Sequence, residues 1–208
     1  METASRFGQF VERMDALVEA KDDPHVIADE TGALLGSLLP HPGFLHERFR
    51  QPGVDSYRQH VVHVHPEGRY SVVSLVWKPG QATPIHDHRC WCVVGVLMGR
   101  ELETRFHLYR GPGGEVLVQD GERTYEPGQV CRLVPPNEDI HRVANAGDDR
   151  TSISIHVYGA DIAKLRTSIN HVFEQPVVDR PPVGSHRVSW RDASPGDPWP
   201  SLAIRSPS

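Results

Sequence analysis

The chain has 208 residues, of which 24% are charged and 38% hydrophobic, and its formal net charge is −5. This length suits one globular domain with appendages. Acidic and basic residues are interspersed, which argues against nucleic-acid and membrane-surface partners, because both need a run of Lys and Arg. The N-terminal segment lacks the apolar core of a signal peptide, and no apolar stretch is long enough to span a bilayer. The three cysteines are expected to be reduced thiols in a cytoplasmic protein.

Residues 1–45 are expected to be helical. Apolar side chains recur there at three- and four-residue spacing, which places them on one face of a helix. They are Phe7, Phe10, Val11, Met14, Leu17 and Val18. After an interruption at residues 22–24, a leucine-rich run predicts a second helix that stops at Pro40. We expect this helical segment to pack on the domain that follows it.

Residues 46–172 are expected to form the main domain. Short β-rich runs such as YSVVSLVW, WCVVGVLMG and TSISIHVYG follow one another and are separated by Gly, Pro, Asn or Asp. This pattern predicts an all-β sandwich or a small barrel. Residues 173–208 are Pro-rich and are expected to be a C-terminal extension on the surface.

Two histidines in the stretch PIHDHRCWCVVGVLMG are candidate metal ligands. Side chains two apart on a strand share a face, so His86 and His88 point together, as two ligands of one metal must. An isolated pair of this kind would as readily be a solvated strand end. The spacing from Gly80 through these histidines to Gly99, however, resembles the first cupin motif, with Cys92 where that motif usually has a glutamate ligand.

A second segment extends the resemblance to cupins. Gly128, Pro135, His141 and Asn145 are similar to the second cupin motif, with an extra residue or two before the histidine. The resemblance implies a mainly β fold, a cupin double-stranded β-helix barrel (jelly-roll-like), here with N-terminal helices. It also implies a metal held by His86, His88 and His141.

The missing glutamate matters for the chemistry. Three neutral imidazoles leave a divalent ion with its full charge and with open coordination positions. Facial triads that include a carboxylate suit Fe(II) oxygenases with a separate co-substrate, whereas a set without carboxylate favours an anionic substrate such as a thiolate. Zinc with a bound hydroxide stays open on ligand identity alone.

A third segment, SISIHVYG, carries polar side chains at alternate positions. Ser154, His156 and Tyr158 therefore share one face of a strand. Buried without partners, each would cost roughly 1–3 kcal/mol. The sequence alone leaves open whether this polar face or the face with the intervening isoleucines and valine is turned toward the core.

Three segments together resemble the cysteine dioxygenase type I family of thiol dioxygenases: YSVVSLVWKPG, PIHDH and HRVANAGDDRTSISIHVYG. The resemblance implies mononuclear non-haem Fe(II) on the three histidines and a hydrogen-bonded relay of Ser154, His156 and Tyr158. It implies a small thiol and O2 as partners. The resemblance also implies that the thiolate and O2 bind side by side and that both oxygen atoms end on sulfur as a sulfinate.

The chain departs from the animal members of this family at a cysteine. Those enzymes join a cysteine to the active-site tyrosine by a thioether. Cys92 is the nearest candidate, but it follows His88 one residue sooner than in those enzymes. Because Cys92 has the same parity as His86 and His88, it is expected to face the pocket, either as a thioether to Tyr158 or as a packed thiol.

A second departure concerns the substrate. In the animal enzymes, an arginine two residues after a tyrosine binds the substrate carboxylate. In the stretch Tyr57-Arg58-Gln59, the position of that arginine is taken by Gln59. This resembles bacterial glutamine-type thiol dioxygenases, which favour 3-mercaptopropionate over L-cysteine and carry an arginine near the position of Arg166. An arginine would be the stronger carboxylate anchor, and a solvated surface position is the alternative for Arg58 and Arg166.

Other functions stay open at this level. One is a non-catalytic metal-binding cupin that acts as a sensor or a binding module, and another is a Zn or Mn cupin isomerase or hydrolase. A sensor or binding module would leave the alignment of Ser154, His156 and Tyr158 unexplained. A cupin isomerase or hydrolase normally uses the glutamate ligand that Cys92 replaces. The sequence does not address the oligomeric state.

Overall fold

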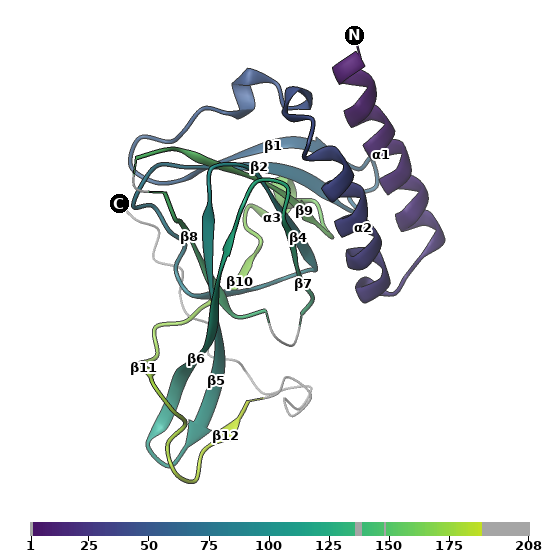
Figure 1. Ribbon diagram of the computed structural model, residues 1–208. Coiled ribbons are helices and arrows are strands. Elements are labelled where there is room, and N and C mark those ends of the chain that lie inside the picture. The colour runs from purple at the N-terminus through teal and green to yellow at the C-terminus, as the bar shows by residue number, and fades with distance from the viewer. Residues whose placement is uncertain (1, 136–138, 148, 189–208) are drawn as a thin grey trace.

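The computed structural model describes residues 2–135, 139–147 and 149–188 (Figure 1). The elements in chain order are α1 (Glu2–Ala20), α2 (Pro24–Leu38), the 3₁₀ turns η1 (Pro42–Phe44) and η2 (Glu47–Phe49), β1 (Arg58–Val64), β2 (Ser71–Trp77), β3 (His86–His88), β4 (Cys92–Met98), β5 (Glu101–Gly111), β6 (Gly114–Tyr125), β7 (Val130–Leu133), β8 (His141–Asn145), β9 (Ser152–Tyr158), α3 (Ile162–Leu165), β10 (Ile169–Val172), β11 (Val177–Val178) and β12 (His186–Arg187).

Two sheets face each other and form a barrel. The first has the strand order β1-β2-β9-β4-β7, and the second has the order β10-β3-β8-β5-β6-β11, with β12 paired to β5. Strands far apart in sequence are antiparallel neighbours, such as β2 with β9 and β5 with β8. This arrangement is typical of a jelly-roll-like barrel. The predicted mainly β barrel with N-terminal helices is confirmed.

Helices α1 and α2 lie side by side, and α2 packs on β4 and β7 of the first sheet (Figure 1). Asp23 caps α2, because its side chain accepts the backbone N–H of His25 at 2.8 Å. The helix approaches β4 closely at Gly95, where a Cβ would lie 2.7 Å from Leu39 Cδ1 and 2.9 Å from Leu35 Cδ2. Glycine at this position therefore lets the helix pack directly on the sheet.

The central strand β9 is buried on both faces. Ile153, Ile155 and Val157 belong to the apolar cluster that includes the inner faces of α1 and α2. The alternate residues Ser154, His156 and Tyr158 face the barrel interior instead. Both faces of β9 are therefore buried. The polar face is turned toward the barrel interior, and the apolar face is covered by the helices.

Strands β5 and β6 extend beyond the barrel as a long hairpin (Figure 1). Within the extension after residue 172, the structure describes residues 173–188, where β11 pairs with β6 and β12 pairs with β5 along this hairpin. The division into segments 1–45, 46–172 and 173–208 stays a prediction. Among the helices of the described ranges, none combines the length and the apolar character needed to cross a bilayer.

Candidate metal centre

Three histidines converge inside the barrel. His86 and His88 are the two ends of β3, and His141 opens β8 directly opposite His86. The ring centroids lie 4.7–4.9 Å apart, and one ring nitrogen from each lies within 4.8 Å of the others. All three side chains are buried. Two of them converge because residues i and i+2 share a face of the strand, and the third joins through strand pairing.

Hydrogen bonds orient two of these rings. The carbonyl oxygen of Pro84 lies 3.0 Å from His86 Nδ1, and Glu103 Oε1 lies 2.8 Å from His141 Nδ1. Each acceptor holds the proton on Nδ1, so the Nε2 lone pair of both rings is left for a metal.

The two acidic residues beside His88 bond to other groups and do not belong to the set of candidate metal ligands. Asp139 Oδ2 accepts the backbone N–H of His88 at 2.9 Å and lies 3.7 Å from its Nδ1. Asp87, between the two histidines in sequence, accepts from the backbone N of His171 at 2.6 Å and lies 2.9 Å from its ring Nδ1. The metal cluster found among the described residues therefore consists of imidazoles alone.

The protonation states suit a cation. Burial lowers the pKa of His86 and of His141, so both rings are neutral near pH 7. Burial raises the pKa of Glu103, but the hydrogen bond from His141 and the charge of Arg105 outweigh it and lower that pKa to about 2. Tyr125 also donates to this carboxylate at 3.0 Å. Neutral ring nitrogens with an anion behind one of them fit a divalent metal ion.

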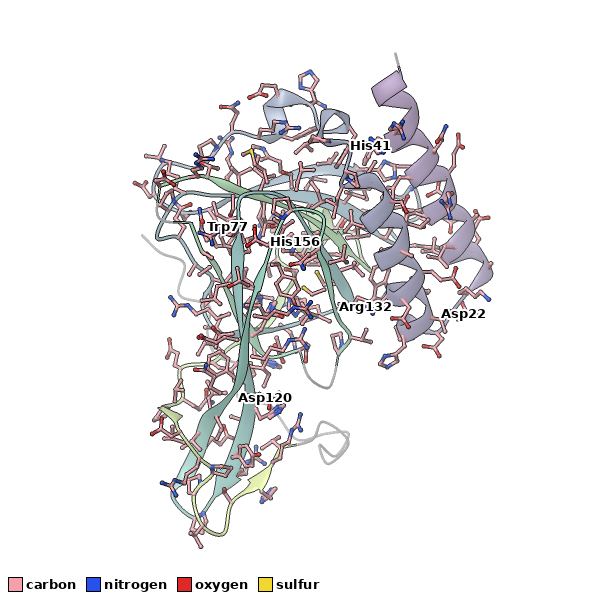
Figure 2. The ribbon with its side chains drawn as sticks, viewed as in Figure 1. Asp22, His41, Trp77, Asp120, Arg132 and His156 are labelled. Carbon is pink, nitrogen blue, oxygen red and sulfur yellow. The ribbon has the colours of Figure 1, made fainter. Side chains whose placement is uncertain are left out.

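A chain of hydrogen bonds lies beside the histidines. Tyr158 Oη lies 3.0 Å from His156 Nδ1, and Ser154 Oγ lies 2.9 Å from His156 Nε2. Trp77 Nε1 donates to Ser154 Oγ at 3.3 Å, and Figure 2 shows Trp77 and His156 near each other in the upper part of the barrel. Burial lowers the pKa of His156 to about 3, so this ring is neutral. The structure thus brings the three predicted relay residues together.

The three histidines and two of the relay residues, His156 and Tyr158, line one cavity. Tyr57 and Gln59 also line it, and their side chains interact by hydrogen bonding. Arg58 and Arg166 are not among its lining residues. Both are exposed, as is Gln59, and Arg166 follows α3 with a left-handed backbone (φ 64°). The described lining residues include neither Lys or Arg nor Asp or Glu. Of the four predicted substrate contacts, Tyr57 and Gln59 reach the cavity.

Cys92 lies behind the relay. It is paired with Tyr158 across β4 and β9, it is fully buried, and its Sγ lies 3.9 Å from the same His156 Nδ1 that Tyr158 contacts. Burial raises the pKa of this thiol well above its usual range. Cys92 is a free cysteine and is not among the residues that line the cavity.

Several buried polar residues of this centre were not identified from the sequence. They are Glu101 and Glu103 on β5, Asp139 before β8, and Ser168, which lines the cavity and hydrogen-bonds with Tyr158. The one available signal was the alternation of the two glutamates in ELETRF. Alternate acidic residues normally mark the solvent face of a strand, so only the structure shows that they point inward.

The chain is similar to a known protein family and to curated proteins. A family model described as cysteine dioxygenase type I matches residues 14–169. The chain is 29% identical over 92 residues to cysteine dioxygenase type 1 of Rattus norvegicus, which covers 44% of this chain and 45% of that protein. It is 27% identical over 108 residues to the Danio rerio protein of the same name, covering 48% and 50%. The chain thus matches about half the length of these curated relatives.

The chain also resembles solved structures. A cupin superfamily protein from Desulfitobacterium hafniense matches with a TM-score of 0.41 and 12% identity, over 59% of this chain and 89% of that chain. A protein with a double-stranded β-helix domain from Klebsiella pneumoniae matches with a TM-score of 0.40 and 20% identity, over 55% and 86%.

Proposed function

The chain belongs to the cysteine dioxygenase type I family, and we propose on this basis that it is a non-haem Fe(II) thiol dioxygenase. It adds both atoms of O2 to the sulfur of a small thiol carboxylate and forms a sulfinate. The observation that carries this proposal is the donor set of His86, His88 and His141, which contains no carboxylate. Three uncharged ligands leave the charge of the ion to be balanced by an anionic sulfur.

The residues of the chain position and protect the reactants. Ferrous iron, when bound to the three histidines, would bring the thiolate and O2 together and allow them to react, and the sulfur would supply the electrons that reduce both oxygen atoms. The Tyr158 hydroxyl, held by His156, is aimed at the same cavity and can donate a hydrogen bond to a reactant there. Trp77 and Leu75 also line the cavity, and their apolar surfaces would limit the access of water to the reacting atoms.

The finer proposal is that 3-mercaptopropionate is preferred over L-cysteine. Gln59 lines the cavity and offers amide donors to a carboxylate. The described lining residues include no carboxylate that could receive the ammonium group that L-cysteine carries and 3-mercaptopropionate lacks. A substrate with one carboxylate and no ammonium group therefore matches the cavity best.

Cys92 and Tyr158 are proposed to remain separate side chains or to form a thioether, depending on oxidation during turnover. Their strand pairing supports this proposal, because it holds the sulfur next to the tyrosine ring. Intact mass before and after turnover distinguishes the two states, since a thioether removes two hydrogens. Cys92→Ala, which cannot form the bond, serves as the reference.

Metal analysis combined with product analysis tests the activity. Protein loaded separately with Fe(II), Zn(II) or Mn(II) is mixed with 3-mercaptopropionate under air. The proposal predicts O2 uptake and an equivalent amount of sulfinate with iron alone. Turnover with Zn(II) or Mn(II) but not with iron would favour an isomerase or a hydrolase. Tight metal binding without turnover of any thiol would favour a sensor or a binding module.

The substrate preference is tested by comparing kcat/KM for 3-mercaptopropionate, L-cysteine and cysteamine on one iron-loaded sample. We expect 3-mercaptopropionate to give the highest value and Gln59→Ala to raise its KM. Arg58→Ala is the matched control, because Arg58 is the neighbouring residue on β1 and lies outside the cavity. A preference for cysteamine would overturn the carboxylate anchor.

A cytoplasmic location is a further proposal. Cys90, Cys92 and Cys131 are all free cysteines in the structure, as expected in a reducing compartment. Fractionation of cells that express the full chain tests it.

A further inference from the structure

A buried carboxyl group that the proposed reaction does not use lies behind the relay. Glu101 is the first residue of β5, and its side chain points into the barrel with 2% exposure. Among the described residues, its Oε2 has no hydrogen-bond partner. Burying a carboxyl group that lacks hydrogen-bond partners costs folding free energy, and an apolar residue at the same position would avoid this cost.

Hydrogen bonds connect Glu101 to the relay. Ser152 Oγ donates to Glu101 Oε1 at 3.3 Å, and the Ser154 hydroxyl lies near enough to this carboxyl group to lower its pKa by hydrogen bonding. Within the relay, His156 bonds to Tyr158 through Nδ1 and to Ser154 through Nε2. Ser154 is therefore the end of the relay opposite Tyr158. A continuous path therefore runs from Glu101 through Ser154 and His156 to the Tyr158 hydroxyl at the cavity.

The hydrogens on this path have two consistent arrangements. Trp77 Nε1 is only a donor, so Ser154 Oγ always accepts from it. If Glu101 is ionised, Ser154 donates to the carboxylate, His156 carries its proton on Nε2 and donates to Ser154, and Tyr158 donates to His156. If Glu101 is protonated, it donates to Ser154. Every bond between these three side chains then reverses, so that His156 Nδ1–H donates to Tyr158 and the Tyr158 hydroxyl proton turns away from His156, toward the cavity and toward Ser168, which lines it.

We propose that Glu101 is a positioning residue that sets the tautomer of His156 and thereby the direction in which Tyr158 donates. This inference rests on the proposed thiol dioxygenase function only for its catalytic consequence. The protonated form of Glu101 is the form that releases the Tyr158 proton toward the reactants. The ionised form holds that proton on the path to His156.

The surroundings of Glu101 support this role. Burial raises its pKa to about 7, and the hydrogen bonds of Ser154 and Ser152 oppose that rise. The titratable groups that share its inner cavity are Tyr125 on β6, Cys131 on β7 and Glu103 on β5, and the residues contributed there by β4 and β8 are valines. Burial raises the pKa of Tyr125 and of Cys131 far above neutral. Glu101 is therefore the member of this cavity that changes charge near pH 7.

The tautomer itself can be measured without turnover. The experiment uses the full chain with Zn(II), a diamagnetic ion, at the three histidines, and ¹⁵N-labelled histidine read by long-range ¹⁵N–¹H correlation. His156→Gln assigns the His156 signals. We expect His156 to pass from the Nδ1–H form to the Nε2–H form between about pH 6 and pH 8. Glu101→Gln should hold a single tautomer over the same range.

Ser152→Ala serves as the matched control. Ser152 contacts Glu101 but stands outside the path to Tyr158. Its hydrogen bond lowers the pKa of Glu101, so its loss should move the tautomer change to higher pH without abolishing it. A His156 tautomer that stays constant with pH in the unmodified chain, or that changes in Glu101→Gln as it does in the unmodified chain, would overturn the proposal.

Activity provides the second measurement. For the iron-loaded protein, kcat/KM should fall about tenfold per pH unit above about pH 7, and Glu101→Gln should lack this decline. Sulfinate formation with a constant His156 tautomer would refute the role of Glu101 and leave the proposed function intact. A tautomer change without turnover of any thiol would refute the proposed function and leave the link between Glu101 and His156 intact.

Discussion

The two faces of strand β9 are both buried but have opposite chemistry. Ile153, Ile155 and Val157 pack into the apolar cluster under α1 and α2. Ser154, His156 and Tyr158 face the barrel interior and bond to one another, and His156 and Tyr158 line the histidine cavity. Apolar burial stabilises a fold by roughly 25 cal/mol per Å², whereas buried polar groups cost about 1–3 kcal/mol each when unpaired. Apolar burial on the helix side of β9 can therefore offset the free-energy cost of burying polar side chains on its cavity side.

This comparison leads to a division of roles that mutations can test. Changes on the cavity side should alter metal binding and activity more than folding. Changes on the helix side should alter folding more than activity.

The largest effect is expected at the metal ligands. His86→Ala removes one of three donors from a set without a protein carboxylate, so iron binding is lost and kcat/KM falls by at least about a thousandfold, or about 4 kcal/mol. Iron content after dialysis and O2 uptake measure this. His25→Ala, an exposed histidine on α2, is the control and should retain both. Full activity of His86→Ala would contradict the assignment of the centre.

A core residue on the helix side should affect folding alone. Leu35 of α2 is fully buried and lies against Gly95 of β4. Leu35→Ala is expected to lower the free energy of unfolding by about 2–5 kcal/mol, as measured by denaturant titration. The activity per folded, iron-loaded chain should stay unchanged.

Val26→Ala on the same helix is the matched control, because Val26 is 37% exposed and its loss should cost little. A Leu35→Ala variant that folds normally but loses activity would contradict the division of roles between the two faces.

The partner behind a ligand should have an intermediate effect. Glu103→Gln removes the anion that accepts from His141 Nδ1, and metal affinity should fall about 10–100-fold. Competition with a chelator measures it. Glu122→Gln, an exposed glutamate on the neighbouring strand β6, should leave the affinity unchanged. Equal affinities for the Glu103→Gln variant and the parent would show that the carboxylate does not tune the site.

The smallest effect is expected on the outer surface. Arg132 of β7 pairs with Asp29 of α2, and both side chains are at least half exposed. Arg132→Ala should cost about 0.2–1 kcal/mol of folding stability, because solvent screens such a pair. Denaturant titration in low and in high salt measures this contribution. A loss above about 2 kcal/mol would show that the helices are held by charge rather than by apolar packing.

Much of the metal centre could be predicted from sequence because it depends on the spacing of residues along single strands. His86 and His88 are two residues apart on one strand, and the alternation of Ser154, His156 and Tyr158 gives one face of another. Strand alternation fixes which residues share a face, and the family motif supplied His141. These positions needed no knowledge of how the sheets are arranged.

The remainder depended on arrangement in space. The alternation that places Glu101 and Glu103 on one face of β5 does not say that this face is the inner one. Whether Arg58 or Gln59 reaches the cavity depends on which face of β1 is turned inward. The burial of the apolar face of β9 required the docking of α1 and α2, which depends on contacts far apart in sequence.

The central claim is that iron is held by three neutral imidazoles and by no carboxylate of the protein. Anomalous diffraction at the iron edge, from crystals of the iron-loaded chain, tests it directly. The account predicts iron density bonded to Nε2 of His86, His88 and His141. Iron bonded to a carboxylate oxygen of Asp87, Glu103 or Asp139, or iron located away from these rings, would contradict it.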